Sequence, residues 1–266
     1  MSKIVVSAGN IARRIAEKGD SGNICGVFSQ GIYCKIKNEL VLLHDAKWGF
    51  VPFGIAIPRF ASFAEKAMAS VDDTVVITND ALTIGEKSFD IAFEGEVPKY
   101  FEPKSEVSDE RIDAIYNYVA ENGSKQGILD YIEKNRVGCA DAIKGLVSGD
   151  GNAAIKLIGL GRGLTPSGDD FLCGFFAVLN ALGVLAVPLR EAVFDALDRT
   201  TLISAAYLKA VIGRRYFTVY DRAIRAIFAD GDFKEDIDFV LSMGASSGTD
   251  TLIGALTAAK MMRNQI

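Results

Sequence analysis

The spacing of apolar residues changes once along this chain, and that change limits the fold more than any other feature. Short apolar runs separated by turn residues fill the first hundred positions, for example 24–29 and 32–37. After a polar, proline-containing stretch at 98–108, apolar residues recur at helical spacing, as over 112–119. Strands followed by helices, rather than strands alternating with helices, are typical of the α+β class.

We therefore predict an α+β fold with an N-terminal antiparallel β domain at 1–105 and a mainly α-helical domain at 106–266. The two-residue break at Asn38-Glu39 is short enough for a tight hairpin. The predicted strands are 24–29, 32–37, 40–44, 74–78, 82–84 and 88–93, with a short helix at 61–70. The predicted helices of the second domain begin near 108 and continue at 124–134, 138–148, 169–185, 189–212, 216–229, 233–242 and 250–263. The segment 189–212 is long enough for two helices.

The segment from Phe171 to Leu189 carries no charged residue, which raises the question of a membrane span. Asn180 lies in its middle and Pro188 near its end, and the segment has no second apolar stretch of this kind beside it. We predict a buried helix over 171–185 in a protein without a membrane partner. The N-terminus lacks the apolar stretch of a signal peptide, and the four cysteines, mostly flanked by apolar residues, fit free thiols in a reducing compartment, so we expect a cytoplasmic protein.

Charge and histidine content exclude several functional classes. The 29 Lys and Arg against 34 Asp and Glu give a net charge of −5, so a nucleic-acid partner is not expected. With His44 as the single histidine, a zinc site of His and Cys is not expected either. Residues 244–248 fit the pattern G-x-S-x-G, but no histidine follows them to complete a hydrolase triad.

A glycine-rich stretch between Lys156 and Gly174 is the most unusual motif of the chain. Gly159, Gly161 and Gly163 precede a predicted helix start, as in phosphate-binding loops. Their spacing departs from G-x-G-x-x-G, and Asp169-Asp170 occupies the place of Lys-Ser/Thr in a P-loop, so neither nucleotide-binding motif is present.

A second segment repeats this motif eighty residues later. Ser167-Gly-Asp-Asp-Phe-Leu-Cys-Gly174 aligns without gaps on Ser247-Gly-Thr-Asp-Thr-Leu-Ile-Gly254. One interpretation is purely structural: both segments are capping boxes, with Ser167 and Ser247 as the caps. The other is a site between two facing helix N-termini, in which glycines and hydroxyls approach an anion. We therefore predict that the two motifs lie close together and line one pocket in the α-helical domain.

The functional interpretation assigns roles to specific residues. Asp169 and Asp170 are the candidate catalytic residues. Helix capping would explain an acidic residue at position 170, but it does not explain the second one at position 169. Mg²⁺ held by these two carboxylates is an alternative to a site without cofactor or metal. The helix near 201–212 adds hydroxyls on one face. The candidate substrate-binding residues are Gly161, Gly163, Thr165, Ser167, Gly168, Thr201, Ser204, Ser246, Ser247, Thr249 and Asp250.

These motifs resemble an uncharacterised domain family that includes a subunit of the bacterial multi-subunit oxamate carbamoyltransferase of allantoin breakdown. The resemblance covers roughly 155–255, through the glycine-rich motif, Thr201-Leu-Ile-Ser204 and Gly244-Ala-Ser-Ser-Gly-Thr-Asp250. The family usually has proline where Arg162 stands, which argues against a catalytic role for Arg162.

The resemblance implies a subunit of a carbamoyltransferase that acts on oxamate or oxalurate with carbamoyl phosphate or phosphate. Its partners would be a small anionic metabolite and the other subunits of a hetero-oligomeric enzyme. Oriented N–H donors would stabilise the negative charge of the tetrahedral intermediate. Two alternatives remain open at this point: a non-catalytic regulatory or scaffold subunit that binds a small anion, and a Mg²⁺-dependent enzyme that handles phosphate.

Overall fold

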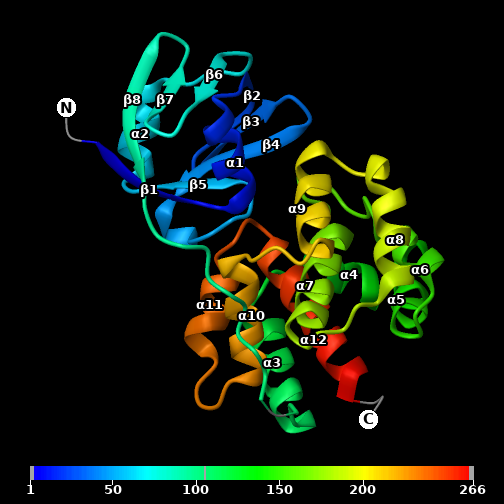
Figure 1. Cartoon of the computed structure of the whole chain (residues 1–266). Coiled ribbons are helices and arrows are strands. Elements are labelled where there is room, and N and C mark those ends of the chain that lie inside the picture. The colour runs from blue at the N-terminus through cyan, green and yellow to red at the C-terminus, as the bar shows by residue number, and fades with distance from the viewer. Residues whose placement is uncertain (1–2, 105, 264–266) are drawn as a thin grey trace. The chain divides into compact units, whose positions relative to one another are not determined.

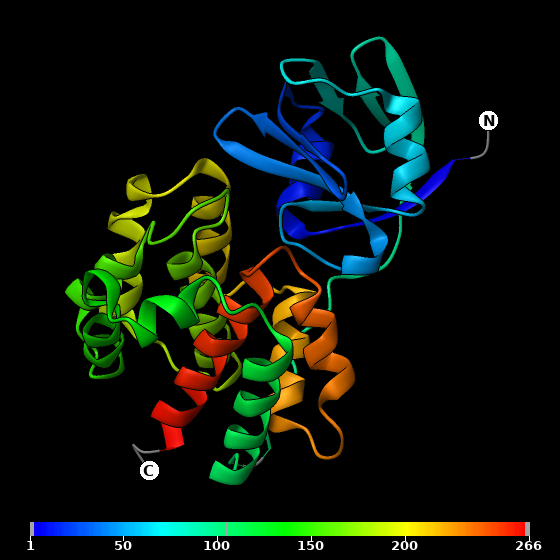
Figure 2. The same cartoon turned by 180° about the vertical axis from the view of Figure 1, so that it is seen from behind.

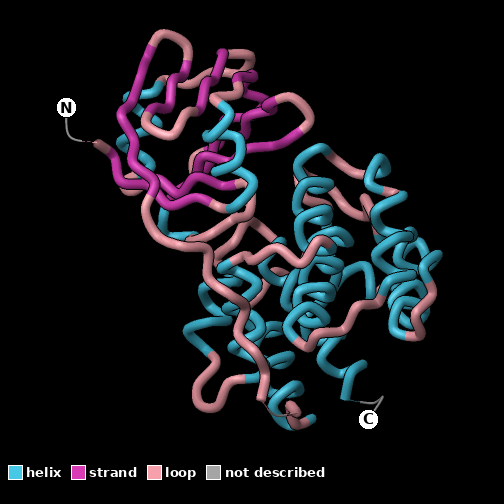
Figure 3. Tube along the Cα trace, in the orientation of Figure 1, coloured by secondary structure: helices cyan, strands magenta, loops and turns pink. Residues whose placement is uncertain are grey.

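The computed structural model describes residues 3–104 and 106–263, which form two compact units (Figure 1). The first unit spans 1–99 together with 216–218, and the second spans 100–215 and 219–266. Figure 3 shows the strands gathered in the first unit, whereas the second is built of helices and loops. The α+β class predicted from the sequence is confirmed.

The strands of the first unit form a closed barrel in the order β1-β5-β4-β3-β2-β6-β7-β8. These strands are β1 (Ile4–Ala8), β2 (Ser21–Phe28), β3 (Gly31–Ile36), β4 (Glu39–Asp45), β5 (Gly54–Ile57), β6 (Thr74–Ile77), β7 (Ala81–Ile84) and β8 (Lys87–Phe93). The prediction of a purely antiparallel sheet is wrong in two places, because β1 pairs parallel with β8 and β4 pairs parallel with β5. The hairpin signals that suggested an antiparallel sheet are local, whereas the β1–β8 pair that closes the barrel joins distant segments.

Buried and exposed side chains alternate along the strands, and the buried ones form the core of the first unit. On β3, Ile32, Cys34 and Ile36 are buried, whereas Lys35 between them is exposed. Side chains from α1 (Asn10–Lys18) and α2 (Phe60–Ala67) join the same apolar cluster. A short 3₁₀ turn, η1 (Ala46–Trp48), follows β4.

Residues 216–218 extend the first unit from a distant part of the chain. The backbone N–H of Phe50 donates to Thr218 Oγ1 at 2.8 Å, and the rings of Phe53 and Phe217 meet edge to face. No local sequence signal indicates this insertion.

The second unit consists of helices joined by short loops (Figure 2). They are α3 (Asp109–Asn122), α4 (Ile128–Glu133), η2 (Arg136–Gly138), α5 (Cys139–Val147), α6 (Gly151–Leu157), α7 (Ser167–Ala181), α8 (Val187–Asp195), η3 (Leu197–Arg199), α9 (Leu202–Ile212), α10 (Thr218–Phe228), α11 (Lys234–Leu241) and α12 (Ser247–Arg263). The segment 189–212 does hold two helices, α8 and α9. The sequence analysis did not predict α6.

Helix α7 is the buried helix predicted from the charge-free segment. Every residue from Ser167 to Asn180 is buried. The helix ends at Ala181, earlier than predicted, and Leu185 beyond it is 59% exposed. Among the described residues, no helix combines the length and the apolar character that crossing a membrane requires.

Helices α7 and α12 form the central pair of the second unit, and their backbones touch. A Cβ on Gly174 would lie 1.9 Å from the carbonyl oxygen of Thr251, and a Cβ on Gly254 would lie 1.9 Å from that of Phe171. The two contacts involve equivalent positions of the two motifs, so the helices meet in a nearly two-fold symmetric way. Glycine at both positions is therefore required by the close approach.

Candidate functional site

The N-terminal ends of α7 and α12 lie side by side. Thr165 Oγ1, in the loop before α7, and Ser247 Oγ, in the first turn of α12, are 3.1 Å apart. This contact confirms that the two repeated motifs lie close together, and that they line one pocket stays a prediction. Both side chains are half-buried, so the hydroxyls form an outer polar layer at the paired helix ends.

Each motif contributes a serine that pairs with the aspartate of the other motif. The Ser247 hydroxyl of α12 acts to lower the pKa of Asp170 on α7, and the Ser167 hydroxyl of α7 acts to lower the pKa of Asp250 on α12, so each serine lies near the aspartate of the other motif. Thr165 has the same lowering effect on the pKa of Asp170, and Ser246 has it on the pKa of Asp250. The repeated Ser-Gly-x-Asp pattern therefore encodes pairing between two helices.

This arrangement corrects the capping-box interpretation of the first motif. The N-cap of α7 is Pro166, with no side-chain capping bond, and Ser167 is already the first helical residue. The interpretation of Ser167 as the cap is therefore wrong, and its hydroxyl lies near Asp250 of the facing helix instead. In α12, the Asp250 N–H donates to the Ser246 carbonyl, so the helical bonding there begins at Ser246.

Several first-turn N–H groups are occupied by the preceding loops. The Gly168 N–H donates to the Leu160 carbonyl at 2.8 Å, and the Gly248 N–H donates to the Met243 carbonyl at 3.0 Å. A Cβ on Gly168 would lie 2.0 Å from the Leu157 carbonyl oxygen. Gly168 thus allows the loop to fold over the helix start, and its N–H does not point at an open site.

The glycines of the loop before α7 serve its backbone path. Gly159, Gly161 and Gly163 all have positive φ, at 72°, 125° and 95°. A Cβ on Gly161 would also lie 2.7 Å from the Ser167 nitrogen, whereas one on Gly163 would meet nothing within 4 Å. Arg162, between them, is exposed.

Asp169 ties three segments together. Its Oδ1 accepts from the Gly159 N–H at 2.8 Å, and its Oδ2 accepts from Ser204 Oγ at 2.7 Å and from Thr200 Oγ1. The side chain is fully buried. The carboxylate is therefore satisfied by protein donors.

The predicted hydroxyls of α9 belong to the same region. Thr201 is the N-cap of α9 and accepts from the Ser204 N–H, while its own hydroxyl donates to the Leu164 carbonyl. Thr201 thereby fixes the start of α9 to the loop before α7, and Ser204 reaches Asp169.

The second motif anchors another helix start. Asp250 Oδ1 accepts from the Ile128 N–H at 2.7 Å, at the N-terminus of α4, and Thr249 Oγ1 accepts from the Ser124 N–H at 2.9 Å. Gly127, with φ of +81°, lies so close that a Cβ there would be 2.5 Å from Asp250 Oδ1. The acidic positions of both motifs thus organise the loops around them.

Two buried carboxylate oxygens remain without partners. Asp170 Oδ2 and Asp250 Oδ2 accept no hydrogen bond from any residue that the structure describes. Burial raises the pKa of Asp170 well above its usual range, and the nearby Asp250 raises it further, against the lowering effect of Ser247 and Thr165. Burial also raises the pKa of Asp250 to about 6. The paired helix ends therefore hold two carboxyl groups with spare acceptor capacity.

The sequence analysis missed two neighbours of Asp170. Cys173 and Tyr220 are buried and hydrogen-bonded to each other, and both interact with the Asp170 charge. Cys173 lies one turn after Asp170 within the motif, so helical spacing could have indicated it. Tyr220, on α10, gives no such signal because only the tertiary fold brings it near. Across residues 3–104 and 106–263, no group of three or more His, Cys, Asp or Glu side chains is placed to hold a metal ion.

Asp169→Asn is expected to lower the free energy of unfolding by about 2–4 kcal/mol, because a neutral amide replaces a buried acceptor of three hydrogen bonds and its NH2 opposes a donor. Urea denaturation followed by circular dichroism measures this change. Asp141→Asn on the exposed face of α5 is the matched control and should stay within about 0.5 kcal/mol of the wild type. If Asp169→Asn loses no more stability than the control, the three hydrogen bonds to Asp169 do not stabilise the fold as described.

The raised pKa of Asp250 predicts a pH dependence of stability. The unfolded group titrates near 3.8 and the folded group near about 6, so the folded state holds its proton over that interval and stability falls as the pH rises through it. The expected fall is on the order of 3 kcal/mol between pH 3 and pH 7. In Asp250→Asn the slope of stability against pH should decrease but not vanish, because the pKa values of Asp169 and Asp170 are also raised. An unchanged slope would show that Asp250 is not the titrating group.

Comparison with known proteins places the site within a recognised segment. No solved structure matches the chain. Residues 157–259, which include both repeated motifs and the Thr201–Ser204 turn, match the family described as oxamate carbamoyltransferase subunit AllH, and the chain resembles that family over this segment.

Proposed function

We propose that this chain is a subunit of a carbamoyltransferase-type enzyme that acts on small anions, with its site at the paired N-terminal ends of α7 and α12. The observation that carries the proposal is that the two helix ends meet through Thr165 and Ser247, and that Asp170 and Asp250 beneath them each have one buried oxygen without a partner among the described residues. The family match supports the reaction class, since it covers the whole of this arrangement.

The chemistry of oxamate and carbamoyl phosphate fits such a site. Both molecules carry an NH2 group that needs acceptors and anionic oxygens that need donors. The outer hydroxyls of Thr165, Ser246 and Ser247 can rotate to donate to a carboxylate or phosphate, and the free oxygens of Asp170 and Asp250 beneath them accept from the NH2 group.

In the proposed reaction the amide nitrogen of oxamate attacks the carbamoyl carbon of carbamoyl phosphate. A C–N bond forms, the bond from that carbon to the phosphate oxygen breaks, and phosphate leaves with the bonding electron pair. The proton lost by the nitrogen passes through a serine hydroxyl to Asp170 or Asp250. A carboxyl pKa near about 6, as for Asp250, suits a base that works near neutral pH.

The remaining candidates divide into two groups under this proposal. Asp169, Thr201 and Ser204 are positioning residues, because their polar groups bond to the loops and helices around the site. Gly161, Gly163 and Gly168 shape the loop, and Thr249 holds the loop before α4. Other subunits of a hetero-oligomeric enzyme would complete the assembly.

Thermal unfolding with oxamate, carbamoyl phosphate or phosphate tests the binding proposal. A ligand that binds the native state raises the Tm by mass action, so millimolar binders register at tens of millimolar. We expect oxamate and carbamoyl phosphate to raise the Tm, and Ser247→Ala to remove the shift. Ser242→Ala is the matched control, because its hydroxyl bonds only to the Phe239 carbonyl at the end of α11. If no ligand raises the Tm of the wild type, or if Ser247→Ala keeps the full increase in Tm, the proposed binding site is wrong.

Turnover separates a catalytic subunit from the alternative of a regulatory subunit that binds anions. Release of phosphate from carbamoyl phosphate in the presence of oxamate is measured for the chain together with its partner subunits. An assembly whose turnover is unchanged by substitutions at the paired helix ends would assign this chain the regulatory role.

A further inference from the structure

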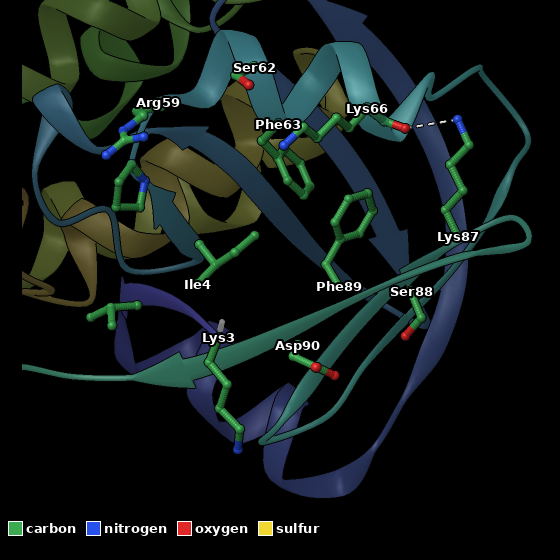
Figure 4. A pocket seen from close by; sticks show the side chains of 12 residues that line it. Lys3, Ile4, Arg59, Ser62, Phe63, Lys66, Lys87, Ser88, Phe89 and Asp90 are labelled. Atoms are coloured by element: carbon green, nitrogen blue, oxygen red, sulfur yellow. Dashed lines mark hydrogen bonds between the residues drawn. The ribbon is translucent and has the colours of Figure 1, made fainter. Parts of the chain in front are cut away.

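A cavity of about 1050 Å³ opens in the first unit, outside the segment that carries the family match (Figure 4). Its walls come from β1, from the turn before α2 and α2 itself, and from β8. The volume slightly exceeds the range of about 300–1,000 Å³ that is typical of small-molecule and cofactor pockets. Nothing in the proposed carbamoyl transfer uses this cavity.

The charge of the cavity wall is opposite to that of the whole chain. Four cationic side chains line it, and they face one carboxylate, that of Asp90. The cations are Lys3, Arg59, Lys66 and Lys87. Since the chain as a whole carries a net charge of −5, this local excess of positive charge favours an anionic ligand.

Part of the wall is aromatic and apolar. The rings of Phe63 on α2 and Phe89 on β8 pack against each other with centroids 4.8 Å apart, and Phe89 keeps part of its surface accessible. Ile4, which packs against the same apolar cluster, is half-buried beside them. A planar ring can pack against such a surface, which a small inorganic anion would leave uncovered.

Arg59 stands at the rim in a costly backbone conformation. Its φ of 53° and ψ of 47° lie in the left-handed region, which non-glycine residues seldom adopt and which often accompanies ligand binding. It is the N-cap of α2, and the first-turn N–H groups of a helix have no partners within it. In the part of the chain that the structure describes, the Arg59 guanidinium makes no hydrogen bond or ion pair.

The lysines of the cavity differ in whether their ammonium groups are already hydrogen-bonded to the protein. Lys87 Nζ donates to the Lys66 carbonyl at 2.8 Å, which joins β8 to α2 across the cavity (Figure 4). Lys66 itself extends its side chain from an exposed position on α2. Arg59 and Lys66 can therefore be changed without removing this cross-link.

We infer that this cavity binds a phosphorylated ligand with a planar ring, of the nucleoside phosphate class. The ring packs against Phe89 and Ile4, and the phosphate lies against Arg59, Lys66 and the first turn of α2. The binding is reversible and needs no covalent step.

Isothermal titration calorimetry with ADP, AMP, adenosine and inorganic phosphate tests the inference on the full chain. We expect ADP to bind, and both adenosine and phosphate to bind at least tenfold more weakly, because each retains only half of the recognised chemistry. Raising the salt concentration should weaken ADP binding. This test involves neither oxamate nor the paired helix ends, so its outcome is independent of the proposed carbamoyl transfer.

Substitutions locate the site. Arg59→Gln with Lys66→Gln should weaken ADP binding at least tenfold, and Phe89→Leu should weaken ADP more than phosphate. Lys18→Gln with Lys35→Gln removes the same charge from exposed positions of α1 and β3 and should leave binding unchanged. Equal affinity for ADP and phosphate, absence of ADP binding, or a loss in the control pair equal to that in Arg59/Lys66 would overturn the inference. Capture of the chain by anionic vesicles without ADP binding would likewise overturn it.

Discussion

Gly174→Ala and Gly254→Ala are each expected to lower the free energy of unfolding of the helical unit by about 3 kcal/mol or more. In either variant the new Cβ would be placed 1.9 Å from a backbone carbonyl oxygen of the facing helix. Backbone atoms in two packed helices cannot move away as the end of a flexible side chain can, so the helices must separate. Glycine to alanine within a helix otherwise stabilises by about 1 kcal/mol, and the expected effect therefore has the opposite sign to helix propensity.

Urea denaturation of the two variants measures this effect. Gly213→Ala, at the end of α9, is the control, because the nearest atom to its Cβ would lie at 3.1 Å within the same helix. We expect this control to change stability by no more than about 1 kcal/mol. If Gly174→Ala unfolds at the same urea concentration as the wild type, the backbones of α7 and α12 do not approach as closely as described.

The close contact explains what the sequence could and could not predict about the site. The matching Ser-Gly-x-Asp-x-Leu-x-Gly segments predicted two similar helix starts near each other, and Thr165 and Ser247 do meet. Capping, however, is a local rule that relates Ser167 to residues of its own helix. The pairing of Ser167 with Asp250 depends on the crossing of two helices, which no spacing along one segment contains.

In the fold, too, the features set by local sequence patterns were predicted, and those set by contacts between distant segments were not. The strand runs and the helical stripes came from periodicity, and the α+β class followed. The parallel β1–β8 pair and the addition of residues 216–218 to the first unit join segments that are distant in sequence. Tyr220 near Asp170 is a third case, because α10 gives no local sign of what it packs against.

Asp170→Asn is expected to separate stability from function. The change keeps the shape of the side chain and removes a carboxyl whose pKa is raised well above its usual range by burial. Such a group disfavours the folded state once the pH is high enough to ionise it, so the variant should be at least as stable as the wild type at pH 8. Asp169→Asn should show the reverse order in stability, because its carboxylate accepts three hydrogen bonds.

The expected loss of activity follows from the carboxyl oxygen of Asp170 that has no hydrogen-bond partner. Asp170 Oδ2 is buried and has no partner among the described residues, so it is available to accept a proton or an NH2 group from a substrate. An asparagine in its place cannot act as a base, and losing a base of this kind costs about 10²–10⁴-fold in rate. We therefore expect kcat for carbamoyl transfer in the assembled enzyme to fall at least about a hundredfold.

Two measurements on the same preparations decide between this account and a structural role. Melting curves at pH 8 compare the stability of Asp170→Asn and Asp169→Asn with that of the wild type, and steady-state kinetics compare their kcat values. The expected result is a stable Asp170→Asn protein with little turnover. A protein that melts well below the wild type yet keeps its turnover would make Asp170 a structural residue. In that case Asp250, the other carboxyl with an unpartnered oxygen, would become the candidate base. Its pKa of about 6 should then appear in the pH dependence of kcat, with the rate rising as Asp250 ionises.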